Sequence, residues 1–143
     1  MAVDTLPTEI HLEIVTPNRQ VVRDKVIAIS LPGKEGYMGI LPGHAPLLSL
    51  LKVGELSYTQ GNVTHYLAVN WGFVEVLGDR VIVLAETAER AGEIDVERAK
   101  RAKQRAEDRL SKLLSEDIEM GRARMALERA MTRLEVAGRN RTY

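Results

Sequence analysis

The 143-residue sequence contains no cysteine, only one tryptophan and one phenylalanine, and no excess of charge of either sign. Without cysteine the chain forms neither a disulfide framework nor a thiolate metal site, which fits a reducing compartment. Lysine and arginine together number 20, as do aspartate and glutamate, so the total charge indicates neither nucleic-acid binding nor adsorption to a membrane. Residues 1–6 lack the basic and apolar segments of a signal peptide, and no stretch reaches the roughly 18 apolar residues of a membrane helix. We therefore expect a soluble protein on the cytoplasmic side.

The first 88 residues show the pattern of short β-strands. Apolar and polar residues alternate over 9–14, and a second apolar run over 25–31 places Ile27, Ile29 and Leu31 on one face. Further strand patterns follow about 8–12 residues apart, separated by turn residues and without an intervening helical period. The fold class predicted for the whole chain is α+β, with an antiparallel β-sandwich of about ten short strands in the N-terminal domain, residues 1–88.

Residues 33–48 are unusually rich in glycine and proline for a segment with this many apolar side chains. Glycine permits positive φ or the close approach of another backbone, whereas Pro42 and Pro46 fix φ and remove amide donors. The pattern predicts a buried or half-buried corner at which the chain crosses between two sheets. The segment lacks the Gly-Lys-Ser/Thr of a phosphate-binding loop, and no long helix follows it.

From Ala88 onward the hydrophobic period becomes helical. Asp95 is a good N-cap for a first helix, Ser115–Asp117 can cap a second one, and Gly138 is expected to end it. The apolar positions recur at spacings of three and four, and they are Ala99, Ala102, Ala106, Leu110 and Leu113, then Ala123, Ala126 or Leu127, Ala130, Leu134 and Ala137. We predict an antiparallel two-helix hairpin over residues 89–143. Because its seam is mostly alanine and buries little apolar area, the hairpin is expected to open or detach readily.

Basic residues line one face of each predicted helix, beside the alanine seam. They are Arg98, Arg101, Arg105, Arg109 and Lys112 on the first helix, and Arg122, Arg129 and Arg133 on the second. Guanidinium groups bind phosphate or carboxylate in a bidentate manner, so a converging set suits an anionic ligand. The more ordinary interpretation is a solvated face with ion pairs such as Glu97–Arg101. An alternative function is a stand-alone module that binds nucleic acid or another anionic partner through the basic hairpin. Against nucleic acid, acidic residues interrupt the basic face and no aromatic residues are interleaved with it.

No pattern in the sequence indicates an active site or a metal centre. His11, His44 and His65 are scattered, and no second histidine or carboxylate lies at a ligand spacing from any of them. His44 is expected to be a turn residue that hydrogen-bonds within its own corner. Trp71 is interpreted as a core or subunit-contact residue. We therefore predict a protein that is not an enzyme.

Several motifs resemble those of one family, in the expected order along the chain. Residues 39–47, Gly-Ile-Leu-Pro-Gly-His-Ala-Pro-Leu, closely resemble the signature of the epsilon subunit of F-type ATP synthases, and residues 70–76 and 88–91 also match. The resemblance covers about residues 9–137. It implies a non-catalytic rotor subunit of the central stalk that couples ion flow to ATP synthesis. Its sandwich would bind the gamma subunit and the c-ring, and the complex would hold it as a peripheral protein at the cytoplasmic face of the bacterial inner membrane.

The resemblance also implies a regulatory role for the hairpin. In one state the hairpin would fold beside the sandwich, and in the other it would extend along gamma, contact the alpha and beta subunits and block ATP hydrolysis. Residues 94–99, Ile-Asp-Val-Glu-Arg-Ala, resemble a motif with which some bacterial epsilon subunits bind ATP. The implied ATP contacts are Glu89, Asp95, Arg98, Ala99, Arg105, Arg129 and Arg133. The expected partner contacts are Arg98, Arg101, Arg109, Arg122 and His44. No metal or required cofactor is implied, and ATP would act as a regulatory ligand.

Overall fold

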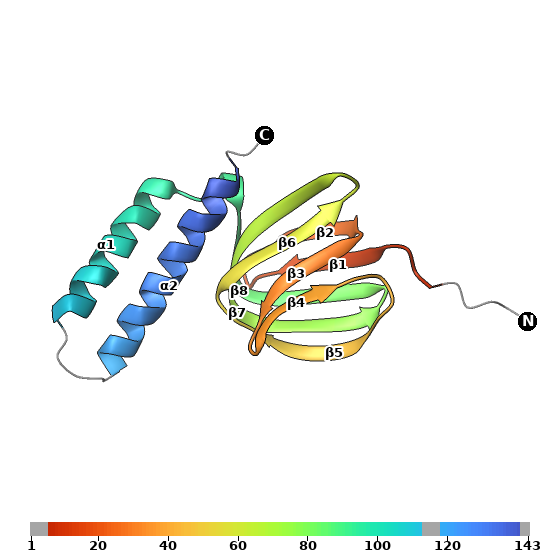
Figure 1. The fold of residues 1–143 in the computed structure, drawn as a ribbon, viewed down its shortest axis with the longest axis horizontal. Helices are drawn as coiled ribbons and strands as arrows, with labels where there is room; N and C mark the ends of the chain where they lie inside the picture. Colours follow the sequence, from red (N-terminus) through yellow and green to blue (C-terminus); the bar gives the residue numbers. More distant parts are fainter. Residues whose placement is uncertain (1–5, 113–117, 141–143) are drawn as a thin grey trace, which may run out of the picture. The chain divides into compact units, whose positions relative to one another are not determined.

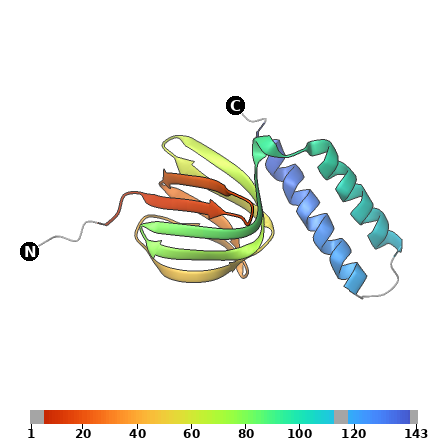
Figure 2. The same cartoon turned by 180° about the vertical axis from the view of Figure 1, so that it is seen from behind.

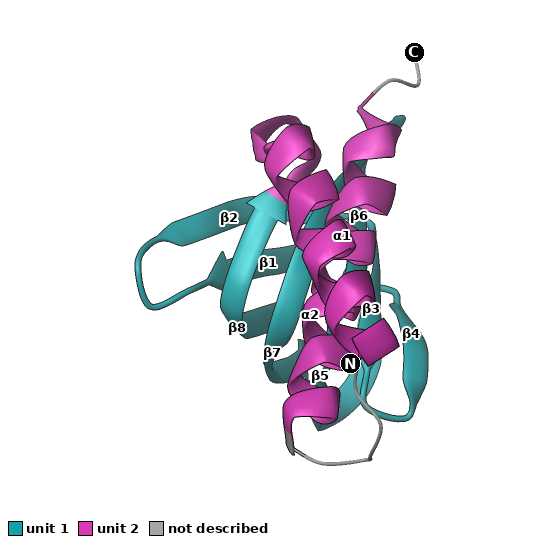
Figure 3. Cartoon of the chain, turned by 90° about the vertical axis from the view of Figure 1, so that its left-hand side faces the viewer, with its two compact units in different colours: residues 1–89 teal, residues 90–143 magenta. Residues whose placement is uncertain are grey.

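A computed structural model describes residues 6–112 and 118–140. The chain forms two compact units, residues 1–89 and residues 90–143, which are coloured separately in Figure 3. The domain boundary predicted from the sequence lies between residues 88 and 89. Leu113 and Ser115–Asp117, which the sequence assigns to the helix seam and to a helix cap, lie outside the described residues.

The first unit is built from β-strands (Figure 1). In the described residues these are β1 (Ile10–Val15), β2 (Gln20–Val26), β3 (Ala28–Gly33), β4 (Gly36–Ile40), β5 (His44–Leu51), β6 (Gly54–Gln60), β7 (Val63–Gly78) and β8 (Arg80–Arg90). The sequence predicts about ten strands, and the described residues contain eight. Part of this difference arises because the long β7 joins two runs that the sequence predicts as separate strands. The resulting architecture is the sandwich-like, strand-only unit that the alternating pattern predicts.

The strands follow the order β2-β1-β8-β7-β5-β3-β4, and β6 pairs with β3 and β7. The pairing of β1 with β8 is parallel, with Leu12 opposite Val81, so the expectation of a purely antiparallel sandwich is wrong for this pair. β1 and β8 are neighbours in the sheet but are far apart in the sequence, so no hairpin turn dictates their relative direction. Figure 2 shows the pair from behind, with β1 in red beside the green β8.

The core of the first unit comes from the inward-facing positions of its strands. Ile10, Leu12 and Ile14 are buried, as their alternation predicts. The predicted single strand over 25–31 is wrong, because the chain ends β2 at Val26 and begins β3 at Ala28, and Ile27 between them is 42% exposed. The buried positions therefore shift phase at this break, since β2 pairs with β1 whereas β3 pairs with β4 and β6.

Residues 33–48 form the end of β3, the turn after it, β4, a second turn and most of β5 rather than a buried corner, and most of these residues are exposed. Gly36 and Gly43 have positive φ values of 134° and 86°. Pro46 lies in β5 at a register shift between His44 and Leu47, which is a site where a strand tolerates proline. The prediction of a buried sheet-crossing corner in this segment is therefore wrong.

The chain instead changes its pairing partner within β7. Residues 63–69 of β7 pair with β6, and residues 72–78 pair with β5. The backbone between these two segments is unusual, because Trp71 has a φ of 39° and Gly72 a φ of 154°. Position 72 accepts only glycine without strain, since a Cβ there would also overlap the carbonyl oxygen of Leu84.

The second unit contains a short 3-10 helix, η1 (Ala91–Glu93), followed by α1 (Val96–Lys112) and α2 (Ile118–Arg139), which pack side by side as the predicted hairpin (Figure 1). The Asp95 carboxylate caps α1 by accepting the backbone N–H of Arg98 at 3.0 Å, as predicted. The buried side chains of the two helices are almost all alanine, namely Ala99, Ala106, Ala123, Ala130 and Ala137, with Val136 in addition. Helix α2 continues through Gly138 and ends at Arg139. Neither helix, within its described residues, is long and apolar enough to cross a membrane.

Candidate functional site

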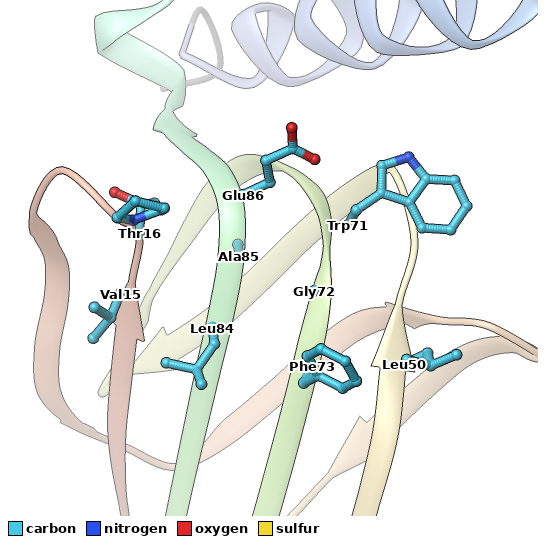
Figure 4. A pocket seen from close by; sticks show the side chains of 10 residues that line it. Val15, Thr16, Leu50, Trp71, Gly72, Phe73, Leu84, Ala85 and Glu86 are labelled. Atoms are coloured by element: carbon cyan, nitrogen blue, oxygen red, sulfur yellow. The ribbon is translucent and has the colours of Figure 1, made fainter. Parts of the chain in front are cut away.

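An open groove of about 690 Å³ lies on the outer face of the first unit (Figure 4). Its apolar lining comes from four strands, with Val15 on β1, Leu50 on β5, Trp71 and Phe73 on β7, and Leu84 on β8. Phe73 and Leu84 are each 52% exposed, so large apolar side chains face solvent in one place. A gathered apolar surface of this kind is typical of a site where another molecule docks.

Strand register explains why these side chains meet. Leu50 is the partner of Phe73 across the β5–β7 pair, and Val15 is the partner of Leu84 across the β1–β8 pair. Directly paired residues on one face of a sheet have their side chains within contact distance of each other. The intervening positions of the same strands, such as Val74 and Val83, point inward and are fully buried. The strands are therefore apolar on both faces at this place.

The sequence interpretation named Trp71 as a core or subunit-contact residue but missed the rest of the groove. A signal for it was present, because residues 72–77 read as a nearly continuous apolar run. In an antiparallel strand with one solvated face, apolar and polar residues normally alternate. An unbroken apolar run therefore indicates that the outer face of the strand is also covered by another molecule or segment.

The basic residues of the hairpin form the second candidate site. Arg98 and Arg105 on α1 are exposed, and Arg129 and Arg133 on α2 are half-buried. At about 100° per residue, each of these four arginines lies roughly 60–110° around its helix from the buried alanines, in the same rotational sense. Because the two helices run antiparallel, equal offsets place the two pairs on the same side of the hairpin. The four arginines therefore lie along one side of the hairpin, an arrangement whose guanidinium groups suit an anionic ligand.

The other residues expected to contact ATP have clear local roles. Asp95 accepts the N–H of Arg98 at the start of α1, and Ala99 is a buried member of the helix seam. Glu89 is half-buried near the end of β8 and belongs to the first unit, whereas the four arginines belong to the second.

The expected partner-contacting residues are mostly accessible. Arg101, Arg109 and Arg122 are exposed on the hairpin helices. Glu97 forms its ion pair with Lys100, at 3.4 Å, rather than with Arg101, and such an exposed pair contributes little to stability. His44 is half-buried at the start of β5, and its ring Nδ1 lies 2.7 Å from the carbonyl oxygen of Ala45. This contact is the one expected of a turn residue bonded within its own segment. The described residues contain no group of histidines and carboxylates that could hold a metal ion.

Comparisons with known proteins match both units. Residues 9–91 match the beta-sandwich domain of the ATP synthase Delta/Epsilon chain, and residues 93–138 match its long alpha-helix domain. An ATP synthase epsilon chain of Syntrophotalea carbinolica is 53% identical over 131 residues, which cover 92% of this chain and 95% of that protein. The ATP synthase epsilon chain of Geotalea daltonii is 50% identical over 132 residues, covering 92% of this chain and 96% of that one.

Solved structures show the same fold. A chain of the mitochondrial ATP synthase of Euglena gracilis, solved as an OSCP/F1/c-ring assembly, superimposes with a TM-score of 0.80 at 26% identity, covering 95% of this chain and 85% of that one. A chain of the central stalk and c-ring of the Tetrahymena thermophila mitochondrial ATP synthase has a TM-score of 0.53 at 14% identity, covering 96% and 100% of the two chains, and so supports the fold alone. The chain therefore belongs to the epsilon chain family of F-type ATP synthases, as a non-catalytic subunit of the synthase.

Proposed function

We propose that this chain is a rotor subunit at the foot of the central stalk of a bacterial F-type ATP synthase, where it helps to couple ion flow to ATP synthesis. The observation that carries the proposal is the apolar groove on the first unit, which provides a docking surface for the gamma subunit. The related Euglena chain was solved together with F1 and the c-ring, which supports the same placement. The chain would associate with the cytoplasmic face of the inner membrane only through the complex.

The c-ring contact is assigned to the exposed β3–β4 hairpin and the turn that follows it. Tyr37 and Leu41 are each 63% exposed there, and His44 lies at the start of the next strand. The hairpin itself is well anchored, because the Tyr37 hydroxyl accepts the backbone N–H of Glu55 at 3.0 Å. An anchored loop with exposed apolar tips suits a contact with the loops of a neighbouring subunit.

The helical hairpin is proposed to regulate ATP hydrolysis. In its compact state the alanine seam holds α1 against α2, and in its extended state the exposed Arg101, Arg109 and Arg122 would meet acidic segments of the alpha and beta subunits. Each buried methyl-sized group contributes only about 0.8 kcal/mol, so a seam of alanines leaves the two states within a few kcal/mol of each other. A balance this close can be shifted by a ligand that prefers one state.

ATP is proposed as that ligand. Arg98, Arg105, Arg129 and Arg133 would bind its phosphates along their shared side of the compact hairpin. Glu89 and Asp95 would orient the adenosine end and the start of α1, and Ala99 is the remaining residue of the proposed set. ATP at a hundredfold excess over its dissociation constant would stabilise the compact state by about 2.7 kcal/mol. At low ATP the hairpin would be released to inhibit hydrolysis and so conserve ATP.

An assay with a catalytic assembly of alpha, beta and gamma subunits tests this function in two steps. The full chain is expected to bind gamma and to slow ATP hydrolysis at low ATP, and the inhibition is expected to weaken as ATP rises. A chain that lacks residues 90–143 should still bind the assembly but should not inhibit it. Failure of the full chain to bind gamma would contradict the rotor role, whereas binding without inhibition would contradict only the regulatory role of the hairpin.

A further inference from the structure

Trp71 occupies a backbone conformation that disfavours a tryptophan. Its φ of 39° is the only positive φ of a non-glycine residue in the described part of the chain. In this left-handed region the Cβ of an L-residue crowds the following carbonyl oxygen, a cost that glycine avoids and that asparagine partly offsets with its short polar side chain. A residue chosen for the stability of the fold alone would be glycine or asparagine.

The surrounding fold imposes this conformation. The chain changes pairing partner between residues 69 and 72, and Gly72 allows β7 to pass against the backbone of Leu84. The preceding residue, Asn70, is 8% exposed, and its side-chain Oδ1 has no hydrogen-bond partner among the described residues. Two consecutive side chains at this bend are therefore unfavourable for folding. Such local costs persist in proteins mainly at sites where the side chain has another use.

The use of the Trp71 side chain is indicated by where it lies. Trp71 is 37% exposed, and its indole lines the same apolar groove as Phe73 on its own strand and Leu50 on the neighbouring one (Figure 4). Tryptophan is among the residue types most enriched in the few positions that dominate binding energy at protein interfaces. Its large area and two side-chain torsions let it fill a partner's pocket at a small entropic cost.

We infer that Trp71 is the anchoring residue with which this chain docks on the gamma subunit, and that the chain keeps it at a cost to its own stability. This inference rests on the proposed docking of gamma in the groove. The carboxylates nearby define the chemistry of the contact further, because Glu86 lines the groove and Glu75 is exposed two residues beyond Phe73 on the same face of β7. The complementary gamma segment carries an apolar pocket for the indole, with basic side chains beside it.

Binding measurements with substituted full-length chains test the inference. Trp71→Gly and Trp71→Asn both suit the left-handed backbone, so each variant should fold and yet bind gamma at least about thirty-fold more weakly, which is about 2 kcal/mol. Trp71→Phe should restore most of the affinity, because an aromatic ring returns to the groove. Val63→Ala is the matched control, since Val63 lies on the same strand, is 55% exposed and does not line the groove.

Two further readouts separate anchoring from a structural role. Trp71→Gly should be more stable than Trp71→Ala, which reverses the usual order of these residues in a strand. Trp71 is the only tryptophan of the chain, so its fluorescence emission reports on the groove. The emission of gamma itself is subtracted with a mixture of gamma and the Trp71→Phe chain. The remaining emission should shift to shorter wavelength on binding. If the unaltered chain binds gamma but Trp71→Gly and Trp71→Asn bind within threefold of it, the anchoring role is overturned while the docking proposal stands. If the unaltered chain does not bind gamma, the proposed function itself fails.

Discussion

Replacing Gly72 by alanine is expected to destabilise the first unit more than any other glycine-to-alanine change in its strands. A φ of 154° lies in a region that essentially only glycine occupies, and holding another residue there costs roughly 1–3 kcal/mol. The new Cβ would also overlap the carbonyl oxygen of Leu84 and lie 3.0 Å from the Cα of Ala85. These are backbone atoms, so relieving the overlap moves β8 and costs roughly another 1–3 kcal/mol.

The two costs together predict a loss of about 2–6 kcal/mol in the free energy of unfolding, out of the roughly 5–15 kcal/mol that a domain of this size has. The midpoint of thermal unfolding should therefore fall by at least about 10 °C. Far-UV circular dichroism during heating and during urea unfolding measures both quantities.

Two other glycines provide matched controls for this measurement. Gly61 has a φ of 57° and open space around its Cβ position, so Gly61→Ala reports the backbone strain alone, about 1–2 kcal/mol. Gly39 has open space and no positive φ, so Gly39→Ala should change stability by less than about 1 kcal/mol. If Gly72→Ala is no less stable than Gly61→Ala, the close passage of β7 past β8 does not constrain the fold.

Three further predictions concern the two units. Removal of residues 90–143 should leave a folded first unit that still binds gamma, because that unit has its own core; a folded truncation without gamma binding, measured by calorimetry, would contradict the division of roles. Asp95→Ala should lower the stability of the hairpin by about 1 kcal/mol through loss of the helix cap, whereas Asp95→Asn should keep most of it, as followed by helical circular dichroism at 222 nm during unfolding. Arg129→Ala or Arg133→Ala should weaken ATP binding measured by titration calorimetry, and Arg101→Ala, which lies outside the proposed ATP set, should leave it unchanged.

Local pattern predicted the parts of the fold that local interactions decide. The alternation at Ile10, Leu12 and Ile14 correctly predicted the buried face of β1. The position of Asp95 before the helical pattern correctly predicted that its carboxylate caps α1. Helical spacing also gave the common face of Arg98 and Arg105, because that face depends only on the 3.6-residue period.

The features that the sequence did not reveal depend on pairing between distant segments. Nothing near Ile27 shows that the chain leaves one partner strand there for another, so the apolar pattern of residues 25–31 predicts one strand instead of two. The change of pairing partner at Trp71 also depends on distant strands, so the local sequence does not predict it. The many glycines and prolines of residues 33–48 instead predict a corner in a segment where the structure has strands and turns. Predicting the groove requires the register of four strands, because only that register places Phe73 and Leu84 on one surface.

The parallel pairing of β1 with β8 has a consequence for how the protein is made. Leu12 and Val81 are partners although almost half of the chain separates them, so β1, which also pairs with the nearby β2, gains its second neighbour only once the last strand of its unit has been made. Non-local pairing of this kind slows folding, whereas the contacts of the α1–α2 hairpin are local and form fast. During synthesis, the edge of β1 that pairs with β8 stays without its partner strand until β8 has left the ribosome. A ribosome pause within the codons for β8 would therefore be expected to increase misfolding, whereas a pause within those for α2 would not.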